Sequence, residues 1–251
     1  MTLYPLTYSA NTVSPENLLF MCIPALVALA GGILAAFWHP SRNARSLIQH
    51  FAAGVVLAAL AVELLPEISR EHAPGLVLAG SFALGSLFMY TLKLWTMRLE
   101  HQNAISGSAG TGSQGLFAAT FIDIAMDGFI IGAGFAAGGE TGPILAIGLS
   151  VELLFLGLAL TSETMKGWRI VAISGALGAV VLTSSLIGNF LLSGASHAVI
   201  GGTLAFSAAA LLYLVTEELL IEAHETEEKP ISTLVLFGGF LAFWSIQLVG
   251  I

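Results

Sequence analysis

Long apolar stretches are the feature that most constrains how this chain can fold. Charged residues make up 10% of the sequence, whereas soluble domains carry about 25%, and the mean hydropathy is +0.89. A membrane-spanning helix needs about 20 mostly apolar residues, and its backbone groups must all be satisfied within the helix. Runs of that length predict an all-α integral membrane protein with eight transmembrane helices, at about 17–38, 46–66, 74–96, 115–137, 142–163, 168–191, 196–221 and 231–251.

Basic residues are concentrated at one side of this predicted bundle. Seven of the eight fall on one side, and Arg70 falls on the other. By the positive-inside rule the basic side is cytoplasmic, so we expect both termini outside. We also expect one domain over residues 1–251, with a flexible, Gly- and Ser-rich cytoplasmic loop at 98–114. The seven residues are Arg42, Arg45, Lys93, Arg98, Lys166, Arg169 and Lys229.

Charge also limits the partners and the processing that the chain can have. The sequence has no basic patch, which argues against a nucleic-acid partner and leaves the lipid bilayer as the surroundings of the chain. Residues 1–20 contain neither Lys nor Arg. We therefore expect the first apolar segment to remain as a span instead of being a cleaved signal peptide.

Three carboxylates, Asp123, Asp127 and Glu152, stand inside the predicted fourth and fifth spans. A charge at bilayer depth costs about 3 kcal/mol or more, so such residues face a bundle interior, a water-filled path or a bound cation. Asp123 and Asp127 are four residues apart and share one helical face. Asp127 and Glu152 lie about equally far from the turn near 139–142, which places them at similar depth in antiparallel helices. The three acids predict a transport pathway with a cation or a shared proton.

A short pattern near the end of the second span returns near the end of the seventh. Glu63-Leu64-Leu65-Pro66-Glu67 and Glu218-Leu219-Leu220-Ile221-Glu222 share their acids and their first two leucines. The two spans run in opposite directions, so the copies would be inverted relative to each other, as in many transporters that bind substrate near the midplane. A chance match in a low-complexity apolar sequence is the alternative.

Together these segments resemble the ZIP (Zrt/Irt-like) family of divalent-metal transporters over essentially the whole chain. Residues 52–67 resemble the family's aromatic-Ala-Gly … His-Leu-Leu-Pro-Glu pattern, and residues 212–225 resemble its Leu-Tyr-Val … Glu-Leu-Ile-Pro-Glu-Ala-His pattern. In the fourth span Asp127-Gly128 matches the family, but Asp123 replaces a histidine. In the fifth span Glu152 stands where the family has a histidine, and the family's two acids and proline are missing.

The resemblance implies a transporter that is not an enzyme and has no prosthetic group. It implies a 3+2+3 arrangement with inverted repeats, an elevator-like movement of metal toward the cytoplasm, and a homodimer. We expect the plasma membrane of a prokaryote as its location. The implied metal site lies between the fourth and fifth spans and consists of Asp123, Asp127 and Glu152.

The donor atoms of this site bear on the choice of ion. Zinc sites favour histidine and cysteine, whereas carboxylates suit harder cations such as Mn²⁺, Mg²⁺ and Ca²⁺, with Fe²⁺ also possible. Carboxylates bind zinc as well, so the expected cargo is a divalent ion of the zinc, manganese, iron or magnesium class. Because three buried acids cannot all stay ionised without a cation, metal binding could also release protons.

Further acids and histidines lie near the span ends. Glu63 and Glu67 predict an outer access route, and Glu218, Glu222 and His224 predict an inner exit route. Solvated span ends are the alternative for these residues. The remaining histidines are isolated in the sequence and indicate interfacial or loop positions, apart from His72, which groups with the outer acids; they are His39, His50, His101 and His197.

Two other functions remain open at this stage. The missing acids of the fifth span would fit a ZIP-like sensor or scaffold that transports nothing. Paired intramembrane aspartates can also activate water, which would fit a membrane-embedded hydrolase. The two aspartates here share one helix without a partnering histidine or serine, which disfavours the hydrolase.

Overall fold

The computed structural model describes residues 14–38, 41–105, 112–159, 167–224 and 230–249, and these ranges contain helices and short turns but no strand. The first half of the chain contains α1 (Pro15–Phe37), α2 (Arg42–Ala58), η1 (Ala59–Leu64), α3 (Leu65–Arg70), α4 (Gly75–Ile105) and α5 (Gly112–Ala137). The second half contains α6 (Thr141–Ala159), α7 (Trp168–Leu192), α8 (His197–Tyr213), η2 (Leu214–Leu219), α9 (Leu220–His224) and α10 (Pro230–Val249).

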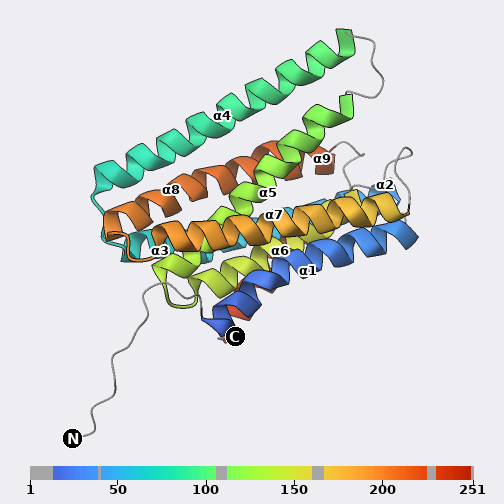
Figure 1. The fold of residues 1–251 in the computed structure, drawn as a ribbon. Coiled ribbons are helices and arrows are strands. Elements are labelled where there is room, and N and C mark those ends of the chain that lie inside the picture. The colour runs from blue at the N-terminus through green and yellow to red at the C-terminus, as the bar shows by residue number, and fades with distance from the viewer. Residues whose placement is uncertain (1–13, 39–40, 106–111, 160–166, 225–229, 250–251) are drawn as a thin grey trace, which may run out of the picture.

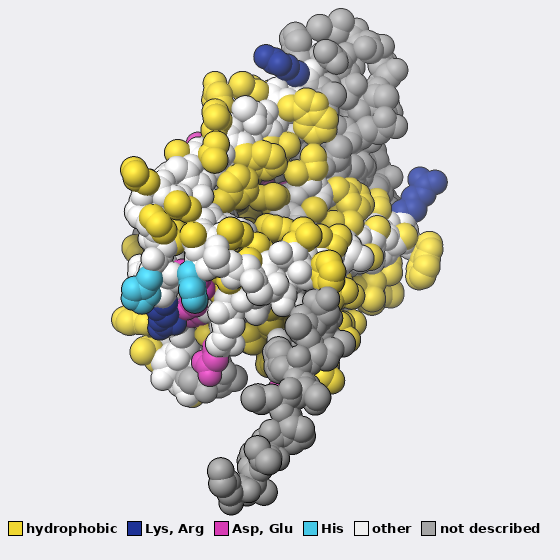
Figure 2. All heavy atoms as spheres, turned by 60° about the vertical axis from the view of Figure 1, so that its left-hand side comes forward, with side chains coloured by type: hydrophobic (Ala, Val, Ile, Leu, Met, Phe, Trp, Pro, Cys, Tyr) yellow, Lys and Arg dark blue, Asp and Glu magenta, His cyan; other side chains and the backbone are white. Residues whose placement is uncertain are grey.

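The helices have the length and the surface of membrane spans. Within the described residues, seven helical segments are long and apolar enough to cross a membrane, and Thr141–Leu156 of α6 is a shorter apolar helix. Large apolar side chains point outward from the bundle, such as Leu76 at 90% exposure and Leu234 at 70%. Figure 2 shows apolar side chains over much of one face. The chain is therefore an integral membrane protein, because lipid is the solvent in which such a surface is stable.

Helix α4 is longer than its predicted span. It continues to Ile105, and α5 begins at Gly112. Residues 98–105 and 112–114, which the sequence analysis assigned to a flexible loop, are therefore helical. The rest of that predicted loop lies outside the described residues.

The helices run side by side, with their connections at two ends (Figure 1). Residues 71–74, 138–140 and 193–196 lie at one end, called the turn end here, and α1 begins and α10 ends there too. Helix α2 begins and α9 ends at the opposite end. Because it carries Arg45, Lys93 and Arg98, this opposite end is called the basic end.

The helices pack in two groups, of which the first is packed extensively within itself and the second consists of two pairs. In the first group, α5 packs on α7, and α1 packs on both α6 and α7. In the second group, α10 packs on α2, and α4 packs on α8. Contacts between the groups, such as those of α2 with α6 and of α5 with α8, are less extensive than those within the first group. They are about as extensive as the contacts of α2 with α9 and of α3 with α8, which join the two pairs of the second group.

Glycines let the helices of the first group approach closely. A Cβ added to Gly31 of α1 would lie 2.6 Å from the Leu154 carbonyl oxygen of α6. One added to Gly132 of α5 would lie 2.7 Å from the Asn189 amide nitrogen of α7. Small residues bring membrane helices into backbone contact, where packing replaces the hydrophobic driving force that lipid cannot supply. These contacts hold α5 and α6 in fixed register with α1 and α7.

Two six-residue π-helical segments occur at equivalent places in the chain. Segment η1 interrupts the span of α2 and α3, and η2 interrupts the span of α8 and α9. Both the start and the end of η2 follow those of η1 by 155 residues, since Ala59 corresponds to Leu214 and Leu64 to Leu219. The same spacing relates Glu63 to Glu218. Local π-helix is rare and is frequent at functional sites.

Proline explains part of the irregularity in the first segment. Pro66 has no backbone N–H, so it cannot donate to the carbonyl of Val62 one turn earlier. The Gln247 side chain of α10 donates to that carbonyl oxygen instead, at 3.2 Å. Residue 221 is isoleucine at the equivalent place in the second copy, so proline does not account for η2.

Candidate metal centre

The three acids of the predicted site converge between α5 and α6. A tight turn joins the two helices, with Gly138 at φ 91° and Gly139 at φ 62°, a conformation that glycine adopts without strain. The turn makes α5 and α6 antiparallel neighbours, and Asp127 and Glu152 reach the same depth as expected. One carboxylate oxygen from each of Asp123, Asp127 and Glu152 lies within 4.8 Å of the others.

Burial makes this cluster costly without a ligand. Asp127 is 3% exposed and Glu152 is 4% exposed, while Asp123 is partly buried. Asp127 Oδ2 and Glu152 Oε2 have no hydrogen-bond partner among the residues that the structure describes. A buried polar group without a partner costs about 1–3 kcal/mol, and a charged one costs more. A bound cation would satisfy both oxygens at once.

The separation of the oxygens is close to what a hard divalent cation requires. Two oxygens on opposite sides of a cation lie roughly 4.2–5 Å apart, because metal–oxygen bonds are about 2.1–2.5 Å long. The observed limit of 4.8 Å falls within that range. All three protein donors are oxygens, and neither α5 nor α6 contains a histidine or a cysteine. The arrangement can hold a divalent ion with water in the remaining positions.

A fourth acid faces this cluster from the other helix group. Glu218 of η2 interacts electrostatically with Asp123, Asp127 and Glu152. Its place near a span end predicted an inner exit route for Glu218 and no link to the three acids. The repeated pattern that pairs Glu63 with Glu218 drew attention to Glu218. A repeat in the sequence, however, does not say how far Glu218 lies from the three acids.

The other copy of the repeat borders a cavity at the turn end. Glu63 and Glu67 are buried and line a cavity of about 460 Å³ at the turn end, together with Arg70 and Glu140. Arg70 donates to Glu67 Oε2 at 3.0 Å. Both acids thus line one cavity, and the outer access route stays a prediction.

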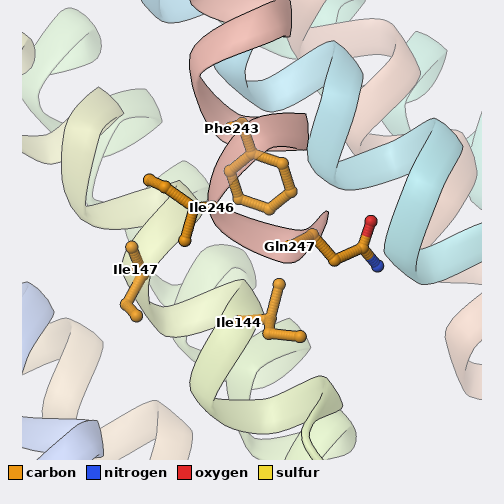
Figure 3. A pocket seen from close by; sticks show the side chains of 5 residues that line it. All are labelled: Ile144, Ile147, Phe243, Ile246 and Gln247. Atoms are coloured by element: carbon orange, nitrogen blue, oxygen red, sulfur yellow. The ribbon is translucent and has the colours of Figure 1, made fainter. Parts of the chain in front are cut away.

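Helix α10 closes one side of this cavity. Figure 3 shows a crevice lined by Gln247 and four apolar side chains, with the Gln247 amide directed away from the others, which are Ile144, Ile147, Phe243 and Ile246. The Gln247 amide donates to Glu63 Oε2 at 2.8 Å. The side chain that replaces the missing Pro66 donor therefore also holds Glu63 in place.

Two histidines expected to be isolated have specific neighbours. His197 Nδ1 lies 2.7 Å from Glu71 Oε2 at the turn end, where Figure 2 shows histidine, basic and acidic side chains together. The ring centres of His50 and His224 lie 5.2 Å apart at the basic end. The interfacial prediction for His50 is wrong, because this side chain is buried between α2 and α9. His39 and the side chains of His101 and Glu222 lie outside the described part.

The chain is similar to a known metal transporter but matches no family profile. The chain is similar to the zinc transporter GufA of Myxococcus xanthus, with 29% identity over 174 residues, which are 65% of this chain and 67% of that protein. This distant homology confirms the resemblance to ZIP transporters that the span motifs indicated.

Proposed function

We propose, from this distant homology and the geometry of the acids, that the chain is a ZIP-type transporter of divalent metal ions. Its metal site is Asp123, Asp127 and Glu152, between α5 and α6. The observation that carries the proposal is the pair of buried carboxylate oxygens without partners, Asp127 Oδ2 and Glu152 Oε2, with the third acid within 4.8 Å. Glu218 adds negative charge to this site from η2.

The cargo that we propose is harder than zinc. GufA is named as a zinc transporter, but the three converging protein donors of this site are carboxylate oxygens. Carboxylates and water suit Mn²⁺, Mg²⁺ and Fe²⁺, while zinc selectivity relies on nitrogen and sulfur ligands. We therefore place Mn²⁺ and Fe²⁺ ahead of Zn²⁺ as substrates of this chain.

The packing supports an elevator-like mechanism. Helices α1, α5, α6 and α7 carry the three acids and form one tightly packed group, which we assign as the moving body. Helices α2, α4, α8 and α10 form the second group and carry the two π-helical segments. Glu63 and Glu218 then stand at equivalent places in the static body, one by the cavity at the turn end and one beside the metal site.

The expected topology belongs to the same proposal. The two π-helical segments and the equivalent pairing of α4 with α8 and of α10 with α2 support a 3+2+3 arrangement with inverted repeats. Both chain ends would lie outside, the basic end would be cytoplasmic, and metal would move toward it. The homodimer and the prokaryotic plasma membrane remain predictions from the family resemblance.

Metal uptake into liposomes tests the proposal. The purified protein is reconstituted with a metal-sensitive dye inside, and Mn²⁺, Fe²⁺, Zn²⁺ or Mg²⁺ is added outside. We expect Mn²⁺ uptake that is lost in Asp127→Ala and retained in Glu16→Gln, whose carboxylate is exposed in the first turn of α1. Zinc uptake with Mn²⁺ and Fe²⁺ inert would contradict the shift in selectivity.

The same assay separates a transporter from a sensor. A ZIP-like sensor would bind metal at the three acids without moving it, so binding would depend on Asp127 while no ion crossed the membrane. Uptake that persists in Asp127→Ala would instead place the transport route elsewhere.

A further inference from the structure

The cavity at the turn end brings three acids and one base together. Glu63, Glu67 and Glu140 line it, and so does Arg70. Of the Lys and Arg residues that the structure describes, only Arg70 lies at the turn end. The cavity of about 460 Å³ has room for a hydrated metal ion, since a water molecule takes about 30 Å³. Three carboxylates and one guanidinium leave its formal charge negative, and a negative cleft concentrates cations.

The two buried acids of this cavity are held by different donors. Glu63 Oε2 accepts from the neutral Gln247 amide at 2.8 Å, whereas Glu67 Oε2 accepts from the Arg70 guanidinium at 3.0 Å. A carboxylate has two oxygens and about four lone-pair sites, so one such bond does not exhaust its capacity to bind a cation. Glu67 differs from Glu63 because its donor is itself a cation.

The Arg70 side chain reaches this carboxylate from the surface. Its exposed fraction is 71%, against 11% for the side chain of Glu67, and the two residues are one helical turn apart in α3. An ion pair with a solvent-exposed partner is weak, because water and salt compete for the charge. The guanidinium can therefore leave Glu67 when another cation arrives. Arginine is not deprotonated in proteins, so it carries its charge at every pH of interest.

We infer that Arg70 is a tethered cation that competes with divalent ions for Glu67 and thereby sets the affinity of this cavity for them. The inference rests on the proposed transport, because it takes the cavity as the place where the cargo enters. A metal ion with two charges displaces the single charge of the guanidinium once its concentration is high enough. The competition lowers the affinity at entry and leaves the three acids between α5 and α6 unchanged.

Direct binding of Mn²⁺ tests this competition. The background is Asp127→Asn with Glu152→Gln, which removes two of the three acids from the carboxylate cluster, and free Mn²⁺ is measured in detergent by electron paramagnetic resonance. For a unit charge and a divalent ion roughly 8 Å apart in water, Coulomb's law with screening at about 10 mM salt gives about a fourfold change in affinity. Adding Arg70→Gln should tighten Mn²⁺ binding by this factor. The same change at exposed Arg98, at the basic end, should have no effect.

Further measurements separate an effect of charge from a structural effect. At about 1 M salt, where the Debye length is about 3 Å, the gain should disappear. Arg70→Lys keeps the charge and should bind Mn²⁺ as the background does. Combined with Glu67→Gln, the gain from Arg70→Gln should fall below about twofold, because the carboxylate for which Arg70 competes is gone.

Three results would overturn the inference. The first is equal Mn²⁺ binding in the Arg70→Gln and Arg98→Gln proteins. The second is a gain that persists at high salt or without the Glu67 carboxylate. The third is an Arg70→Lys protein that binds Mn²⁺ as tightly as the Arg70→Gln protein does.

Uptake of Mn²⁺ into liposomes then links the cavity to transport. With the three acids intact, Arg70→Gln should lower KM about fourfold and leave the maximal rate unchanged, since it acts on entry alone. An unchanged KM in a transporting protein would overturn the role of Arg70 in entry. Absence of flux in the wild-type protein would contradict the proposed function instead, and the binding measurements would still decide whether Arg70 competes for Glu67.

Discussion

Asp127→Asn should change the stability of the protein in opposite directions without and with metal. The substitution keeps the size of the side chain and removes one charge from a cluster whose oxygens lie within 4.8 Å of one another. At roughly 4.8 Å and an effective dielectric constant of about 20, each pair of carboxylates repels by about 3.5 kcal/mol. Proton uptake relieves much of this repulsion, so we expect the metal-free variant to gain ~1–3 kcal/mol in free energy of unfolding.

With metal the order should reverse. A ligand that binds only the folded state stabilises it by about 2.7 kcal/mol at a hundredfold excess over its dissociation constant. Wild-type protein should show this gain with Mn²⁺, and Asp127→Asn should lose most of it, because Asp127 Oδ2 is one of the two buried oxygens without a partner. Thermal unfolding in detergent after chelator treatment, and then along a Mn²⁺ titration, measures both effects.

A matched control and two contrary outcomes make the experiment decisive. Glu16→Gln makes the same chemical change at an exposed position, and we expect little effect on either measurement. Destabilisation of the metal-free protein by Asp127→Asn would show that the carboxylate stabilises the fold, which contradicts a self-repelling cluster. Equal stabilisation of both proteins by Mn²⁺ would show that the ion binds elsewhere.

Four further substitutions, one of them a control, test the packing, the cavity at the turn end and the fourth acid. Gly132→Val should lower the folded yield, because any side chain there overlaps the backbone of α7, whereas Gly175→Ala should be tolerated, since its Cβ would have one neighbour at an ordinary 3.6 Å. Gln247→Leu should cost about 1–3 kcal/mol in thermal unfolding, because it leaves Glu63 and a backbone carbonyl without their donor; an unchanged melting temperature would contradict this. Glu218→Gln should weaken Mn²⁺ binding about tenfold by calorimetry through the loss of a facing charge, and unchanged affinity would remove it from the site.

Much of the candidate site follows from local rules of helix geometry. The four-residue spacing of Asp123 and Asp127 places them on one face, and their distance from the glycine turn places Glu152 at the depth of Asp127. These relations involve neighbours in the chain, so spacing alone predicts them. The electrostatic interaction of Glu218 with this cluster and the ring contact of His50 with His224 join residues far apart in the sequence, and no spacing rule predicts them.

The sequence by itself determined that the chain is a helical membrane protein with acids inside its spans, because hydropathy and helical periodicity act over about 20 residues. It also indicated the repeat around Glu63 and Glu218, since both copies carry the same acids. Only the tertiary structure decided which copy faces the three carboxylates and which faces the cavity at the turn end. The two copies are similar in sequence, so the difference arises from the helices that pack against each: α10 brings Gln247 to Glu63, while Glu218 lies beside the cluster of α5 and α6.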